Sequence, residues 1–83
     1  MDKNETSLNL EIKGHRLLEI AGHGVFNNPQ LFGGKHFDLR GVAVRYDDTV
    51  ATYALSVKGK PTKAQVQAMR VFISGIAYAY GAL

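Results

Sequence analysis

The sequence predicts an α+β domain, in which one long C-terminal helix packs on one face of an antiparallel sheet of three to four strands. Two patterns carry this prediction. Apolar and polar residues alternate over residues 7–13 and again over 39–58, which is typical of half-buried strands. Apolar residues then recur with helical spacing over residues 63–80. A chain of 83 residues is long enough for a single small domain, so residues 1–83 are treated as one unit.

The composition is that of a folded domain. Apolar residues make up 46% of the chain and charged residues 20%, which is too apolar for a disordered chain. The chain has no cysteine, which excludes disulfide frameworks, thiol catalysis and cysteine-ligated zinc.

The first elements are a tail and a strand. Residues 1–6 are polar and lack the apolar core of a signal peptide, so we expect a short tail. Over residues 7–13, Leu8, Leu10 and Ile12 share one face, which predicts a half-buried strand.

Residues 17–21 are ambiguous. A three-residue turn at residues 14–16 would pair Ile12 with Leu18 and favours a second strand in a hairpin. The same residues also fit a short helix that ends at Gly22. We favour the strand.

Residues 22–37 are rich in glycine and asparagine, and they predict a long loop. Loops of this length in compact domains are usually functional or mobile. We therefore expect a target-binding loop. Its candidate contact residues are His23, Phe26, Asn27, Asn28, Phe32, Lys35 and His36.

Residues 39–46 and 49–58 flank Asp47 and Asp48, which suit a two-residue hairpin turn. That register pairs Val44 with Ala51, Val42 with Tyr53 and Arg40 with Leu55. It places Val42, Val44, Tyr53, Leu55 and Val57 on one face, and Arg45, Thr52, Ser56 and Lys58 on the other.

The last element is the helix over residues 63–80. Thr62 and Gln65 form the capping-box pattern at its start, and Gly81 is a natural stop. One side of the helix carries bulky residues suited to the sheet, namely Val66, Met69, Phe72, Ile73, Ile76 and Tyr80. Tyr53 and Tyr80 are expected in the core.

Another side of this helix is apolar but small, and a monomer of this size has little with which to cover it. We therefore expect homodimerisation, or a partner protein, at this side. The candidate interface residues are Ala64, Ala68, Val71, Gly75, Tyr78 and Ala79. The alternative is that the N-terminal hairpin or the 22–37 loop wraps the helix.

The net charge of +3 is unevenly distributed. Residues 49–83 contain no acid and four bases, which are Lys58, Lys60, Lys63 and Arg70. Residues 57–64 look slightly like the end of a double-stranded RNA-binding domain. The resemblance extends over residues 38–83, but this sequence lacks the first helix of that family. The resemblance implies phosphate contacts by these four bases. An ordinary solvated helix start is the alternative.

Catalytic and metal-binding patterns are absent from the sequence. His15, His23 and His36 lack the spacing of a helical ligand pair, and no HExxH or GxSxG motif occurs. Gly33-Gly34-Lys35-His36 departs from the phosphate-binding Walker pattern. We expect no metal, no cofactor and no enzymatic activity.

The expected function is therefore a non-enzymatic protein-binding module that acts as a homodimer. An accessory or inhibitory role fits, such as that of a phage or mobile-element protein that blocks a host defence complex. The alternative is a small basic nucleic-acid-binding protein. The longest apolar stretch, residues 71–83, is shorter than the roughly 20 residues of a membrane span. We therefore expect a soluble cytoplasmic protein.

Overall fold

The computed structural model describes residues 4–81, which form an α+β fold. Its elements, in chain order, are β1 (Glu5–Lys13), α1 (His15–Asn27), a short 3-10 helix η1 (Pro29–Leu31), β2 (Leu39–Asp47), β3 (Val50–Lys58) and α2 (Lys63–Gly81). The three strands form one sheet in the order β1-β3-β2, and both outer strands are antiparallel to β3.

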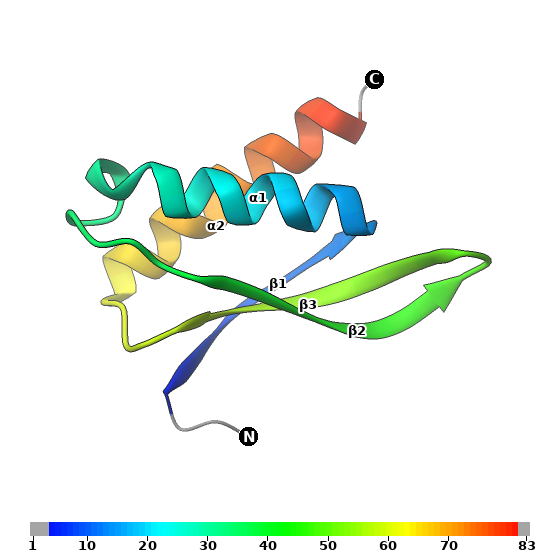
Figure 1. Cartoon of the computed structure of the whole chain (residues 1–83), viewed down its shortest axis with the longest axis horizontal. Coiled ribbons are helices and arrows are strands. Elements are labelled where there is room, and N and C mark those ends of the chain that lie inside the picture. Colours follow the sequence, from blue (N-terminus) through cyan, green and yellow to red (C-terminus); the bar gives the residue numbers. More distant parts are fainter. Residues whose placement is uncertain (1–3, 82–83) are drawn as a thin grey trace.

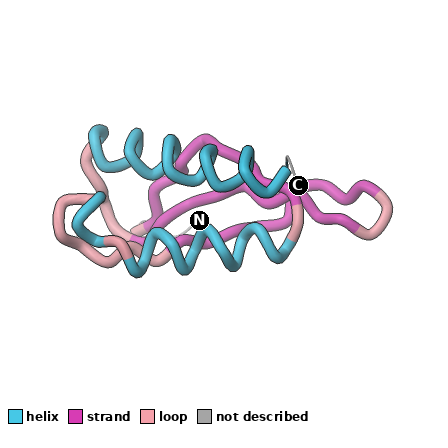
Figure 2. The backbone as a smooth tube through the Cα atoms, turned by 90° about the horizontal axis from the view of Figure 1, so that it is seen from above, coloured by secondary structure: helices cyan, strands magenta, loops and turns pink. Residues whose placement is uncertain are grey.

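Both helices cover the same face of the sheet (Figure 1). Seen from above, the tip of the β2–β3 hairpin extends beyond the helices (Figure 2). The other face of the sheet is therefore left without helical cover.

The predicted strand at residues 17–21 is wrong, because these residues lie in α1. Gly14 has a φ of +99° and its N–H donates to the Ala51 carbonyl at 2.8 Å, so the chain leaves the sheet there. Ala21 and Val25, four residues apart, then face the core with no exposed surface. Since β1 and β2 both pair with β3, α1 is the crossover of a split β-α-β unit.

The predicted long loop over residues 22–37 is correct only in its second part, because residues 32–37 contain no helix or strand whereas most of residues 22–31 are helical. Helix α1 continues through Gly22 and Gly24 to Asn27, and η1 follows after Asn28. A Cβ on Gly24 would lie 2.8 Å from the Phe72 ring, so this glycine permits the close approach of α2. The predicted tail is shorter than expected, because β1 begins at Glu5; residues 1–3 lie outside the described residues.

The predicted hairpin is confirmed as an element, but its register is wrong. The turn lies at Asp48 and Thr49, with Asp48 at a φ of +55°. A bulge between Ala43 and Arg45 shifts the pairing again, so that Val42 lies opposite Ala54. Val42 is therefore on the face away from Leu55 and is 63% exposed.

The core lies between the inner face of β1 and β3 and the two helices. Met69 and Ile73 of α2 have no exposed surface, as the bulky side of the predicted helix requires. Phe32, which follows η1, packs edge-on against Phe72 at 5.7 Å between ring centroids. The fully enclosed members of this core are Leu8, Ala21, Val25, Val57, Met69 and Ile73.

The outer face of the sheet carries charged side chains beside the exposed Val42. Three ion pairs join β1 to β2 across small residues of β3. They are Glu5 with Arg40 at 3.5 Å, Glu11 with Arg45 at 2.7 Å and Lys13 with Asp47 at 3.4 Å. Exposed pairs of this kind each contribute only about 0–1 kcal/mol to stability.

The capping box at the start of α2 is confirmed. The Thr62 N–H donates to Gln65 Oε1 at 2.8 Å, and the Gln65 N–H donates to Thr62 Oγ1 at 3.1 Å. Gln65 Nε2 also donates to the Phe32 carbonyl at 3.1 Å, so the cap ties α2 to the segment after η1.

Replacing the capping residue tests this arrangement. Thr62→Ala removes the acceptor for the Gln65 N–H, and we expect the free energy of unfolding to fall by about 1 kcal/mol. Urea denaturation measures this change. Thr49→Ala, at an exposed turn residue, is the control and should change stability by less than about 0.5 kcal/mol. Equal losses in both variants would contradict the role of the cap.

Candidate interaction surface

The outward side of α2 carries an apolar seam, which we define as Ala64, Ala68, Val71, Gly75 and Tyr78. Val71 is 63% exposed and Tyr78 is 81% exposed. A Cβ on Gly75 would meet nothing within 4 Å. The spacing of four, three, four and three residues is that of a helix–helix seam. The small side predicted from the sequence is therefore uncovered over most of its length, including the exposed Ala79.

The alternative prediction, that the chain wraps this side itself, holds only near Ala68. Leu31 and Phe32 lie beside Ala68, Val71 and Phe72 around a hollow of about 390 Å³. Leu31 remains 50% exposed and extends the seam sideways. Leu31 was not among the residues predicted from the sequence. The local signal for it is Pro29, which follows Asn28 at the start of η1.

The two outer strands of the sheet are poor sites for strand addition. The pairing of β1 with β3 is irregular between Ser7 and Glu11, where Asn9 has a φ of +52°. The pairing of β2 with β3 is irregular between Ala43 and Arg45. Bulges on outer strands disrupt the regular row of backbone groups that another strand needs. The seam is therefore the better candidate for association.

The predicted target-binding loop is divided by the structure. Phe32 is 1% exposed and belongs to the core, so it is not available to a target. His23, Phe26 and Asn27 lie on α1, while Asn28 donates through Nδ2 to the Gly24 carbonyl at 2.7 Å.

Phe26 and His36 come together at the end of α1. Their ring centroids are 4.9 Å apart, and His36 Nδ1 lies 2.7 Å from the Phe26 carbonyl oxygen. Phe26 is 43% exposed, and both His36 and Lys35 are exposed. These residues form a mixed surface rather than a mobile loop.

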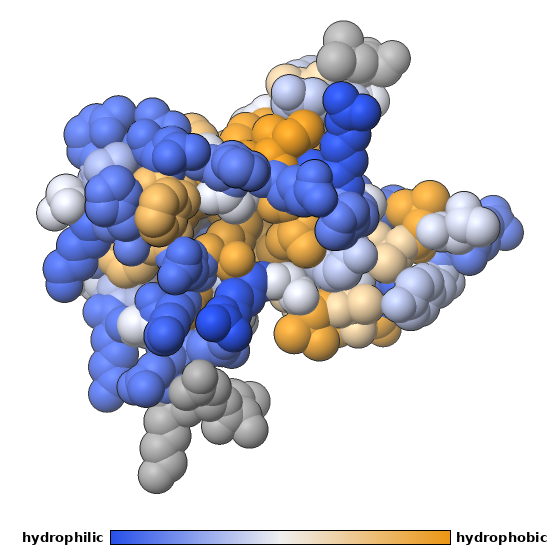
Figure 3. Space-filling model, in the orientation of Figure 1, coloured by the Kyte–Doolittle hydropathy of each residue, from blue (hydrophilic) through white to orange (hydrophobic). Residues whose placement is uncertain are grey.

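The predicted basic residues gather at the end of the molecule where α2 begins. Lys58, Lys60 and Lys63 are exposed there, whereas Arg70 is half-buried on α2. Figure 3 shows hydrophilic side chains over this end. Within residues 4–81, the bases that form ion pairs are Lys13, His15, Arg40 and Arg45. The predicted phosphate-binding residues therefore have no acidic partner in this part of the chain. They are Lys58, Lys60, Lys63 and Arg70.

Two of the histidines contact different neighbours. His15 Nε2 lies 2.8 Å from Glu19 Oε1, while His36 contacts Phe26. Over residues 4–81, no three histidine or carboxylate side chains gather as metal ligands do.

Comparison with known proteins finds no matching family, no similar curated protein and no similar solved structure. Neither of the helices described here has the length and apolar character needed to cross a bilayer.

The two sides of α2 predict opposite responses to truncation. Ile73→Ala, at a fully buried position, should lower the free energy of unfolding by about 2–5 kcal/mol. Val71→Ala, on the seam, should change it by less than about 0.5 kcal/mol when measured on the dilute monomer. Thermal denaturation at low protein concentration makes the comparison. A large loss at Val71 would show that the chain covers this side itself.

Proposed function

We propose that the chain is a non-enzymatic protein-binding module that forms a homodimer through the α2 seam. One observation carries this proposal. The heptad-spaced seam of α2 is exposed over Val71, Gly75 and Tyr78, with open space above Gly75.

The chemistry of the seam suits a second copy of itself. Alanine and glycine allow two helix backbones to approach closely, while Val71 and Tyr78 supply apolar contact area. A two-fold dimer brings the same surface together from both protomers. Val71 lies near the middle of α2 with the small residues Ala68 and Gly75 on either side, so the seam can meet a second copy of itself.

The charge on α2 favours an antiparallel arrangement. Lys63 is the first residue of α2, and no acid occupies the first turn. A cation at the N-terminus of a helix is unfavourable, because it lies next to the positive end of the helix dipole. In an antiparallel pair, each Lys63 would lie near the negative C-terminal end of the partner helix, whereas a parallel pair would place the two lysines together.

The proposed dimer leaves other surfaces free for a target. The β2–β3 hairpin tip carries Val44, Tyr46 and Val50, all exposed. The end of α1 offers His23, Phe26 and His36. In this proposal the module acts in the cytoplasm as an accessory or inhibitory protein, and a phage or mobile-element origin would fit that role.

Gly75→Gln tests the dimer. The substitution has room in the single chain and improves helix propensity by roughly 0.5–1 kcal/mol, so the monomer should remain folded. At the seam, the added side chain should block close helix contact. Light scattering coupled to size-exclusion chromatography should show a dimer for the natural chain and a monomer for the variant.

Ser74→Gln is the matched control, because Ser74 is exposed on α2 outside the seam. It should remain a dimer. A natural chain that is monomeric at high concentration, or a Gly75→Gln variant that remains dimeric, would refute the proposal.

A second candidate function is nucleic-acid binding at the basic end. Lys58, Lys60 and Lys63 are exposed and have no acidic partner among residues 4–81, which favours phosphate contacts. Lys60→Glu should then weaken duplex binding strongly, whereas Arg16→Glu, an exposed base at the start of α1, should weaken it little. Fluorescence anisotropy at several salt concentrations measures both. Binding that is insensitive to salt, or equally affected by the two variants, would exclude this candidate.

A further inference from the structure

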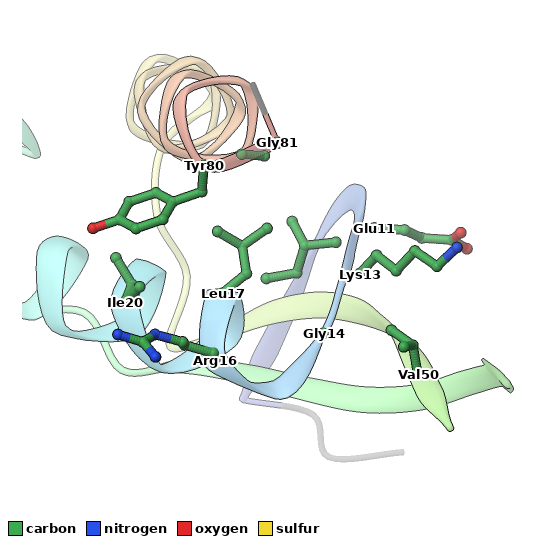
Figure 4. Close-up of a pocket in the computed structure, with 11 residues that line it drawn as sticks. Glu11, Lys13, Gly14, Arg16, Leu17, Ile20, Val50, Tyr80 and Gly81 are labelled. Carbon is green, nitrogen blue, oxygen red and sulfur yellow. The ribbon is translucent and has the colours of Figure 1, made fainter. Parts of the chain in front are cut away.

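An apolar cavity of about 610 Å³ lies at the end of the molecule opposite the basic end. It is bounded by the end of β1, the start of α1 and the last turns of α2 (Figure 4). The principal apolar residues that line it are Ile12, Leu17, Ile20, Val50, Ala77 and Tyr80. Small-molecule sites in proteins typically have volumes of about 300–1,000 Å³ and mostly apolar walls.

The shape of α2 explains the cavity. Toward its C-terminal end α2 rises away from the sheet, while α1 remains close to it (Figure 1). Ala77 is too small to fill the resulting wedge. Tyr80 reaches from α2 toward Ile20 of α1 and closes one side, although it is 49% exposed and not in the core as predicted (Figure 4).

Three charged residues line the cavity, and two of them are already engaged. Glu11 pairs with Arg45 at 2.7 Å, and Lys13 pairs with Asp47 at 3.4 Å. Their charged ends point away from Leu17 (Figure 4). Arg16 is exposed and, within the described part of the chain, has no carboxylate partner. The unbalanced charge at the rim is therefore positive.

The start of α1 has the same polarity. Gly14, which lines the cavity, caps α1 without a side-chain hydrogen bond, and no acid lies in the first turn. The free amides and the helix dipole add positive potential beside Arg16.

We propose that this cavity binds a medium-chain carboxylate, with the acyl chain among Leu17, Ile20 and Tyr80 and the carboxylate at Arg16. Charge complementarity selects this ligand: the apolar walls accept an alkyl chain, and Arg16, the charged lining residue that has no ion-pair partner among residues 4–81, accepts an anion. The proposal does not depend on the dimer, because none of the α2 seam residues lines this cavity.

A series of probes below their micelle-forming concentrations tests the apolar half of the proposal. Isothermal titration calorimetry with octanoate, decanoate and dodecanoate should show affinity rising roughly fourfold for each added methylene. Dodecylammonium should bind at least roughly threefold more weakly than dodecanoate, because Arg16 would repel it. Equal affinity for the anion and the cation would overturn the assignment of the carboxylate to Arg16.

Two pairs of variants locate the site. Ala77→Phe should fill the cavity and reduce dodecanoate affinity more than tenfold, whereas Ser74→Phe, on the same helix but outside the cavity, should leave it unchanged. Arg16→Glu should weaken dodecanoate roughly three- to tenfold and leave 1-dodecanol unchanged. Lys35→Glu, at an exposed residue that lies outside the cavity and outside the α2 seam, is its charge control.

The proposal would be overturned if the natural chain bound none of the probes, or if Ala77→Phe and Ser74→Phe lowered the affinity for dodecanoate equally. It would also be overturned if the protein sedimented with phosphatidylglycerol vesicles but had no affinity for free dodecanoate. The failure of the dimer test would leave all of these readouts interpretable, since they are measured on the monomer or the dimer alike.

Discussion

The packing of α1 and α2 on one face of the sheet governs which surfaces of this structure are buried and which remain exposed. Leu55 and Val57 of β3 are buried beneath the helices, with 2% and 0% of their surface exposed. Because both helices pack on the inner face of the sheet, the outer face is exposed to solvent. Small β3 residues and ion pairs between β1 and β2 suit that exposure.

This arrangement also determines what α2 leaves uncovered. A helix can bury only the side that faces the sheet, and here Met69 and Ile73 do so completely. The opposite side holds the α2 seam. Its apolar residues can be removed from water, and so contribute to stability, only if a second helix packs against them. The rise of α2 from the sheet then leaves the cavity beside Tyr80. The proposed dimer and the proposed ligand site thus follow from one packing geometry.

Part of the candidate surface is predictable from the sequence. Helical spacing alone separates Val71, Gly75 and Tyr78, on the outward side, from the buried Met69 and Ile73. The glycines and asparagines around Phe32 are typical of loops and predict, wrongly, that Phe32 belongs to a binding loop. The contact of Phe32 with Phe72, 40 residues later in the chain, places it in the core.

The β2–β3 hairpin as an element, the α2 helix and its capping box were predictable from the sequence, because they depend on residues near one another in the chain. The assignment of residues 15–27 to α1 depends instead on tertiary contacts. Their apolar residues fit both a strand and a helix, and Gly24 becomes favourable in a helix only when Phe72 packs against it. Strand order and register were decided in the same way, because they depend on pairings and bulges that join distant residues.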